Sequence, residues 1–281
     1  MGKALFHIML AAAVLLININ SLNRAFGGTR ELPFHAGEKM TFQVKWLSVL
    51  AGGATIELLP PETLNSEDSN HFLFTVRTSE FVDMFYKVRD RIESYTDANM
   101  THSLLYTESH RGKSRKDASV DFDWVKQEAQ YSKKGENKQR PPVAIVPGTF
   151  DPLSIFFAFR LIDLNEKSEI ILPATDGKKM VLGKVNVVRK EVIKVNGISY
   201  DTFLVEPELG DLGGVFDKSK DAKLQIWVTA DNRHIPVRMK SKVAVGSFVA
   251  ELASYYEGTG TERPDSTAPD LAGQTDNAAV Q

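Results

Sequence analysis

The sequence predicts a mainly β protein: a strongly curved antiparallel meander, open and barrel-like, around a single central helix. Short segments with alternating apolar and polar residues follow one another from residue 40 to residue 256, and this period of two is typical of strands with one buried face. One strongly apolar segment, residues 151–164, interrupts them. Its apolar arc is wider than a flat sheet covers, so we expect the sheet to curl around it. A two-sheet sandwich is the alternative.

The N-terminal segment predicts export. Lys3 is the only charge before Arg24, residues 4–17 are almost entirely apolar, and residues 25–27 offer small side chains to a signal peptidase. We expect residues 1–27 to be a signal peptide cleaved after Gly27, leaving no transmembrane segment. A retained anchor is the alternative, although the apolar run is shorter than the roughly 20 residues that span a bilayer.

Composition limits the remaining classes. The chain has no cysteine, which excludes disulfides and a lipid-modified N-terminal cysteine. Residues 28–257, the predicted single domain, hold 31 basic and 32 acidic side chains. This near-neutral balance argues against a nucleic-acid partner, whose binding surface is basic. Residues 258–281 are acidic and almost free of large apolar side chains, so we expect a disordered tail.

Strand signals begin early in the predicted domain. Phe42, Val44 and Trp46 alternate with polar residues, and the Gly52-Gly53 pair that follows predicts a hairpin with the apolar series at residues 54–58. Further strands are expected around residues 72–76, 86–95, 104–110 and 120–124. The basic segment 111–116, centred on a glycine, predicts an exposed turn.

The helix has a recognisable start, because Asp151 can cap it and Pro152 fits its first turn. After the helix, alternation predicts strands around residues 180–192, 198–205, 224–229, 236–245 and 248–256. Between two of these, Asn196-Gly197 is a strong hairpin signal.

Several motifs together resemble one family. They are residues 37–46 (GEKMTFQVKW) with 51–54 (AGGA), 151–154 (DPLS) with Arg160, 226–231 (IWVTAD) with 235–237 (IPV), and 245–252 (VGSFVAEL). In combination they resemble the exported bacterial proteins of the domain of unknown function 3108 family, over residues 33–256. The family has no established activity, so the resemblance assigns no functional residue. It implies a Gram-negative periplasmic location, which agrees with the signal peptide.

No motif for catalysis or metal binding is present in the sequence. The six histidines are scattered and cysteine is absent, so we expect no metal site and no cofactor. The G-x-S-x-G elbow of hydrolases does not occur. The sequence therefore predicts that the protein is not an enzyme, with a site assembled from distant Ser, His and Asp residues as the remaining alternative.

Charged segments have two interpretations each. The cluster in residues 87–93 could hold an anionic head group inside the sheet, or form an exposed face of paired charges. The basic turn at 111–116 could contact anionic lipid, or be a solvated loop.

Aromatic residues supply the candidate ligand site. They concentrate in residues 81–86 and 156–159, and a curved sheet with a helix inside either packs such side chains solidly or leaves a groove for an apolar ligand. Periplasmic lipoprotein carriers offer a loose architectural analogy for the groove. This hypothesis assigns six residues to ligand binding: Trp46, Phe85, Tyr86, Arg89, Phe156 and Phe159.

Three functions therefore compete. The first is a periplasmic protein that binds or carries a lipid or another apolar envelope component. The second is a structural or interaction module for envelope proteins, without a ligand. The third is an enzyme with a dispersed site. The first predicts an enclosed apolar volume, the second a filled core with an exposed apolar patch or sheet edge, and the third a polar cleft with perturbed titratable groups.

Overall fold

A computed structural model describes residues 32–112, 115–137, 139–208, 223–243 and 246–258. The predicted signal peptide and the predicted tail after residue 258 lie outside these ranges. The described residues form one antiparallel sheet of 14 strands and two short helices. None of these helices is long and apolar enough to cross a membrane.

The sheet consists of two meanders, β1–β8 and β9–β14, which are joined where β1 pairs with β14. Starting from one edge, the order is β8-β7-β6-β5-β4-β3-β2-β1-β14-β13-β12-β11-β10-β9. The strands are β1 (Glu38–Trp46), β2 (Val49–Leu64), β3 (Glu67–Thr78), β4 (Val88–Asp97), β5 (Ser103–Gly112), β6 (Arg115–Asp123), β7 (Glu128–Lys133), β8 (Val143–Ala144), β9 (Ser168–Thr175), β10 (Met180–Val195), β11 (Ile198–Pro207), β12 (Lys223–Thr229), β13 (Pro236–Val243) and β14 (Gly246–Glu257). The helices are α2 (Glu80–Asp83) and α3 (Ser154–Phe159).

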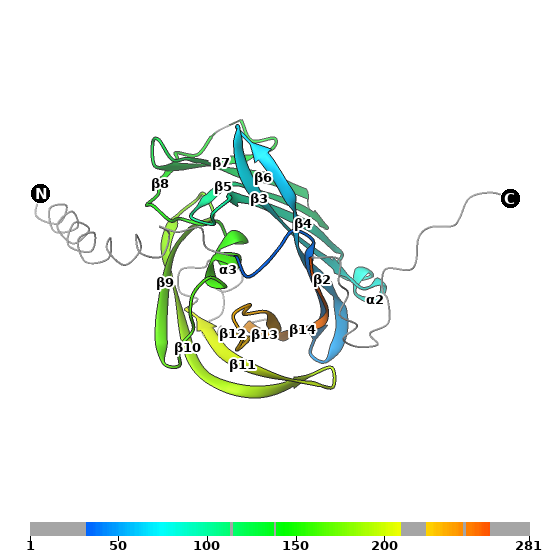
Figure 1. Ribbon diagram of the computed structural model, residues 1–281. Helices are drawn as coiled ribbons and strands as arrows, with labels where there is room; N and C mark the ends of the chain where they lie inside the picture. Colours follow the sequence, from blue (N-terminus) through cyan, green and yellow to red (C-terminus); the bar gives the residue numbers. More distant parts are fainter. Residues whose placement is uncertain (1–31, 113–114, 138, 209–222, 244–245, 259–281) are drawn as a thin grey trace, which may run out of the picture.

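The sheet curls around α3, as the sequence predicts (Figure 1). Its two edge strands, β8 and β9, are not paired with each other. The chain leading into α3 joins β9 instead, because the Phe150 amide donates to the Pro173 carbonyl at 3.0 Å and the Thr175 amide donates to the Phe150 carbonyl at 2.9 Å. The sheet is therefore an open barrel whose gap is bridged by the segment before the helix.

The start of α3 is fixed by a buried carboxylate. Asp151 Oδ1 accepts the backbone N–H groups of Leu153 and Ser154 at 2.8 and 3.0 Å. Asp151 Oδ2 accepts hydroxyl hydrogen bonds from Ser94, Ser103 and Ser154 at 2.5–2.6 Å. Because all four side chains are fully buried, this cluster ties the helix to β4 and β5.

The helix is shorter than the predicted 151–164 segment. After Phe159 the backbone bonds span three residues instead of four, with Arg160 N–H donating to Phe157 O and Leu161 N–H to Ala158 O. At this point the Arg160 side chain turns into a buried ion pair with Glu38 on β1. The long-range ion pair between Arg160 and Glu38 thus coincides with the end of the helix, although the apolar pattern of the sequence continues.

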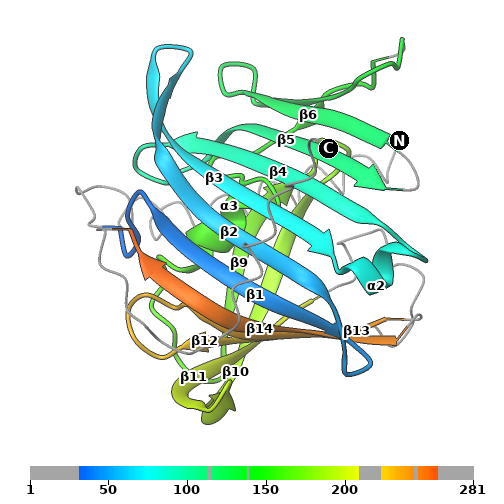
Figure 2. The same cartoon turned by 90° about the vertical axis from the view of Figure 1, so that its right-hand side faces the viewer.

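A second helix, α2, lies outside the predicted central helix. This one-turn helix lies between β3 and β4 at the end of the sheet that also carries the β1–β2 turn (Figure 2). It contains no buried residue, so no hydrophobic periodicity marks it in the sequence.

Two of the hairpin predictions have different outcomes. Asn196 and Gly197 form the predicted β10–β11 turn, with φ angles of 49° and 90°. The predicted hairpin between the first two strands also forms, since β1 pairs with β2. Its turn, however, lies at Leu47 and Ser48, with φ angles of 46° and 73°, and Gly52 lies inside β2. A Cβ on Gly52 would lie 2.1 Å from the Arg77 carbonyl oxygen, so this glycine serves a close approach of β2 to β3 and not a turn.

Strand β9 is missing from the sequence prediction, which resumes strands only near Met180. Pro173 lies in β9, and a proline weakens a strand signal because it cannot donate to a ladder. The structure tolerates it because β9 is an edge strand. Its unpaired side receives Phe150.

The main core fills the curl on the side of α3. Phe157 is completely buried; its ring stacks on Phe72 with centroids 4.0 Å apart and meets Phe34 edge-on at 5.3 Å. A second cluster, behind the end of the helix, contains Phe159 and Val187. The side chains around α3 therefore form two clusters of buried residues.

Candidate functional site

The structure divides the six predicted ligand-binding residues between two places. Trp46, Phe85, Tyr86 and Arg89 lie at the end of the sheet that carries α2, whereas Phe156 and Phe159 lie on α3. None of the six lines either of the two cavities described below. Their assignment to one ligand site stays a prediction.

Trp46, Phe85 and Tyr86 of the first group belong to a larger exposed surface, which we call the apolar rim. It combines the β1–β2 turn with α2 and the residues that follow it. Trp46 stacks on Phe248 of β14, with ring centroids 6.4 Å apart. Eight large apolar side chains, each 40–78% exposed, make up the rim: Trp46, Leu47, Val49, Leu50, Phe81, Met84, Phe85 and Tyr86.

Polar contacts hold the α2 part of the rim against the sheet. The Ser79 amide donates to the Ala51 carbonyl at 2.8 Å. Asp83 accepts hydrogen bonds from the Thr78 hydroxyl and from Arg89, each at 2.5 Å. The hydrogen bonds from Arg89 and Thr78 hold the pKa of the Asp83 carboxyl below its usual value. Arg89, predicted to bind a ligand, is thus engaged in fixing α2 to β3 and β4.

Partly exposed apolar side chains continue from the rim toward α3 along one face of the sheet. Val44 is two residues from Trp46 on β1 and pairs with Ala250, which pairs in turn with Met239. On the other side, Phe74 pairs with Ile92. These side chains pack against the main core but are not fully covered. We call this set the inner apolar face: Val44, Phe74, Val76, Ile92, Met239 and Ala250.

The two predicted residues of α3 differ in their accessibility. Phe156 is partly buried and packs against the same core cluster as the inner apolar face, with its ring edge-on to Phe157 at 5.5 Å. Phe159 is buried in the second cluster. Of the two, only Phe156 has ring surface available to a ligand.

A charged cluster borders the inner apolar face on β4, β5 and β6. His110 contacts Asp90 through Nδ1 at 2.8 Å and Glu108 through Nε2 at 3.0 Å, and Lys116 bonds Glu108. Burial opposes ionisation here, yet these contacts outweigh it: they raise the pKa of His110 and lower the pKa of Glu108. The cross-strand pairs Val76–Asp90 and Ile92–Glu108 place the charges directly beside apolar side chains.

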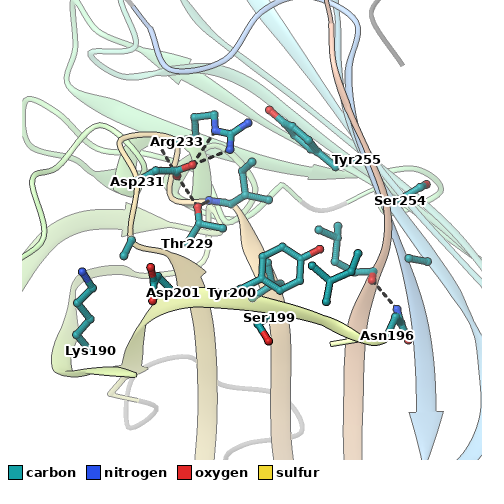
Figure 3. A pocket seen from close by; sticks show the side chains of 16 residues that line it. Lys190, Asn196, Ser199, Tyr200, Asp201, Thr229, Asp231, Arg233, Ser254 and Tyr255 are labelled. Atoms are coloured by element: carbon teal, nitrogen blue, oxygen red, sulfur yellow. Dashed lines mark hydrogen bonds and ion pairs between the residues drawn. The ribbon is translucent and has the colours of Figure 1, made fainter. Parts of the chain in front are cut away.

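The larger of the two cavities lies elsewhere, between the β10–β11 hairpin, the β12–β13 turn and β14 (Figure 3). It has a volume of about 460 Å³. Apolar side chains such as Tyr200 and Leu252 line it together with charged ones. Arg233 is already paired with Asp231 at 2.7 Å, so these two charges are satisfied within the protein. A smaller cavity of about 350 Å³ is also lined by Arg233, together with Arg160 and His234.

The buried Asp151 and Arg160 side chains are bonded within the protein. Asp151 is bonded by serines and backbone amides, and no histidine is among its partners in the described residues. Arg160 is bonded by Glu38 and donates to the Arg233 carbonyl at 2.8 Å. Among the described residues no group of three or more His, Asp or Glu side chains is placed to hold a metal ion.

Some residues of the apolar rim and of the inner apolar face are not among those predicted from the sequence. Leu47, Val49 and Leu50 could have been found, because an apolar run across a turn is unusual for a soluble loop. The partial exposure of Val76 and Met239 could not be predicted, because alternation predicts which face a side chain is on and not how completely that face is covered.

Comparison with a solved structure from Brucella abortus supports the fold. A β-barrel-like protein of the DUF1849 family from Brucella abortus superimposes with a TM-score of 0.51 at 9% identity, covering 79% of this chain and 98% of that one. A Bacteroides fragilis protein described as exported, with a YmcC-like fold, gives 0.36 at 9% identity, covering 80% and 98%. Hypothetical protein CT021 from Chlamydia trachomatis gives 0.36 at 7% identity, covering 82% and 91%.

Comparison with curated proteins found no match. The family model described as "Protein of unknown function (DUF3108)" matches residues 41–253, which span the sheet from β1 to β14 and include α3. The description assigns no activity. The chain belongs to the DUF3108 family, as its sequence motifs predict.

Proposed function

We propose that the protein is exported to the bacterial periplasm and binds a lipid or another apolar envelope molecule on the inner apolar face, beside α3. The observation that carries the proposal is the partial exposure of Val44, Phe74, Val76, Ile92 and Met239 on the face that elsewhere forms the core. Apolar side chains left uncovered inside a curved sheet gain free energy when an apolar ligand covers them.

The surroundings of this face suit an amphiphile. The cluster of Asp90, Glu108, His110 and Lys116 lies beside the apolar side chains and contains both signs of charge. A ligand with an apolar body and a polar head would contact both regions. The two cavities beside Arg233 have mixed linings that contain no side chain of the inner apolar face, so the proposed ligand site is separate from both.

Export is supported by the sequence of residues 1–27, with its charged start, apolar run and small residues before Gly28. The intact mass of the protein isolated from its own cells tests this part. A mature chain beginning at Gly28 in the periplasmic fraction is expected, and a chain retaining Met1 in the membrane pellet would contradict it.

Native mass spectrometry of the exported protein tests ligand binding directly. A co-purifying lipid mass that disappears on denaturation is the expected result. Titration with an apolar fluorescent probe, checked by displacement with phospholipid monomers, then measures the affinity of the site.

Val76→Ser tests the location. It removes apolar surface from the inner face, and we expect about threefold to tenfold weaker probe binding. The matched control is Thr75→Ser, one residue earlier on the opposite face of β3. Equal probe affinity in the two variants, with both folded, would place the ligand elsewhere.

An interaction module without a ligand is the second candidate, and the apolar rim favours it. That function predicts a bare polypeptide in native mass spectrometry and no saturable probe binding. The rim would then be the functional surface.

A further inference from the structure

The apolar rim concentrates exposed apolar area at one place. Among the described residues, eight of the twelve exposed large hydrophobic side chains belong to it; the others are Val125, Ile171, Leu182 and Val192. Single exposed apolar residues are ordinary, whereas a contiguous cluster marks an interaction surface. The rim is also held in place, through the Ser79–Ala51 hydrogen bond and the Arg89–Asp83 ion pair.

The composition of the rim favours a lipid partner. Trp46 and Tyr86 carry polar atoms on large rings, the type of side chain that gathers at the interface between water and hydrocarbon. Phe81, Met84 and Phe85 add purely apolar groups on a single turn of chain. An interfacial anchor of this kind inserts its apolar groups at the level of the lipid head groups.

The charges around the rim identify the type of lipid surface. Lys87 follows Tyr86 directly and is exposed. The β5–β6 hairpin brings Arg115 to the same end, because Gly112 pairs with Val88. On the other side, the Leu47 amide donates to the Ser247 carbonyl at 3.1 Å, and Ser247 pairs with Lys242. Lys87, Arg115 and Lys242 form no ion pair with another described residue.

Near the rim, basic side chains outnumber acidic ones that are not already paired. Asp83 is bonded by Arg89, and Asp117 is paired with Arg111 at 2.7 Å. Glu80 is exposed on α2. An apolar cluster bordered by lysine and arginine side chains that form no ion pair with another described residue complements a bilayer that carries anionic head groups.

We propose that the apolar rim docks the protein on an anionic phospholipid surface, with Phe85, Leu47 and their neighbours inserted between head groups and Lys87, Arg115 and Lys242 against the lipid phosphates. This interaction does not depend on a ligand on the inner apolar face. Docking at the rim would also bring the inner apolar face close to the lipid, because Trp46 of the rim and Val44 of the inner apolar face are two residues apart on β1.

Vesicle flotation tests the proposal, with protein isolated after export so that all variants share one N-terminus. Vesicles contain phosphatidylethanolamine with about 30% phosphatidylglycerol, and phosphatidylcholine vesicles serve as the uncharged comparison. We expect binding to the anionic vesicles that weakens with salt. Absence of binding at low salt would overturn the proposal.

Two sets of surface variants locate the contact. Leu47→Ser with Phe85→Ser should lower partitioning about tenfold or more. Lys87→Gln with Arg115→Gln should lower it by about fivefold per basic residue removed, hence about 25-fold. Val125→Ser with Ile171→Ser is the matched control, since these apolar residues are exposed outside the rim. Wild-type partitioning in both rim variants would overturn the proposal.

Sedimentation analysis tests the alternative that the rim binds a second copy of this chain and not a lipid surface. A wild-type dimer that becomes monomeric in the Leu47→Ser, Phe85→Ser variant, without vesicle binding in either, would make the rim a self-association interface and overturn the lipid proposal. Probe binding on the inner apolar face, measured on the same variants, reports the proposed function separately.

Discussion

Glu38 and Arg160 form a fully buried ion pair that joins the first strand to the end of the central helix. Arg160 Nη1 lies 2.5 Å from Glu38 Oε1, and Nη2 lies 3.1 Å from Oε2. The guanidinium also lies over the rings of Phe34 and Phe157, 5.1 and 5.5 Å from their centroids. Both charges are therefore satisfied only when β1, α3 and the N-terminal Phe34 are assembled together.

Glu38→Gln removes one charge of this pair and leaves Arg160 buried without its partner. We expect the free energy of unfolding to fall by about 3–5 kcal/mol, measured by denaturant melts. The matched control is Glu169→Gln, whose carboxylate pairs with Lys184 at 2.9 Å on the surface and should cost about 0–1 kcal/mol. Equal losses in the two variants would show that the buried pair is not a special stabilising contact.

Gly52→Ala tests the close approach of β2 and β3. The new Cβ would lie 2.1 Å from the Arg77 carbonyl oxygen, so the strands must move apart, at a cost of about 1–3 kcal/mol. Gly53→Ala is the control, because its nearest contact is the Phe42 carbonyl oxygen at 3.4 Å. Thermal melts that rank Gly53→Ala as the more destabilised variant would be incompatible with this packing.

The adjacent residues Phe156 and Phe157 separate packing from ligand binding. Phe157→Ala creates a cavity in the core and should cost about 3–5 kcal/mol. Phe156→Ala removes a partly exposed ring, so it should cost clearly less while weakening the binding of an apolar probe. Melts and probe titrations on both variants check this. Unchanged probe binding in Phe156→Ala would remove this ring from the proposed site.

His110 gives the stability a defined pH dependence. Burial alone would lower its pKa, but Glu108 and Asp90 raise it overall. A raised folded-state pKa stabilises the fold fully below the unfolded value of about 6.5, and this contribution is lost as the pH rises through the folded-state pKa. The loss caused by His110→Asn should therefore be larger at about pH 5.5 than at about pH 8.5. Denaturant melts at both pH values measure it, and a pH-independent loss would contradict it.

The local pattern of the sequence determined the strands and several turns. Alternation at Phe42, Val44 and Trp46, and the Asn196-Gly197 pair, depend on interactions between near neighbours, and these residues are where the sequence predicts them. The prediction that the sheet curls around the helix also held, because an apolar arc as wide as that of α3 needs cover on several sides.

Tertiary structure alone decided where the helix ends, what Gly52 does and which apolar side chains remain uncovered. Arg160 ends α3 because its partner Glu38 is 122 residues away in the sequence, and Gly52 is required by the Arg77 backbone on another strand. The apolar rim arises because the β1–β2 turn and the segment from α2 to the start of β4, both with apolar residues, meet at one end of the sheet. Each of these depends on the distance between residues remote in the chain, and no local pattern encodes that distance.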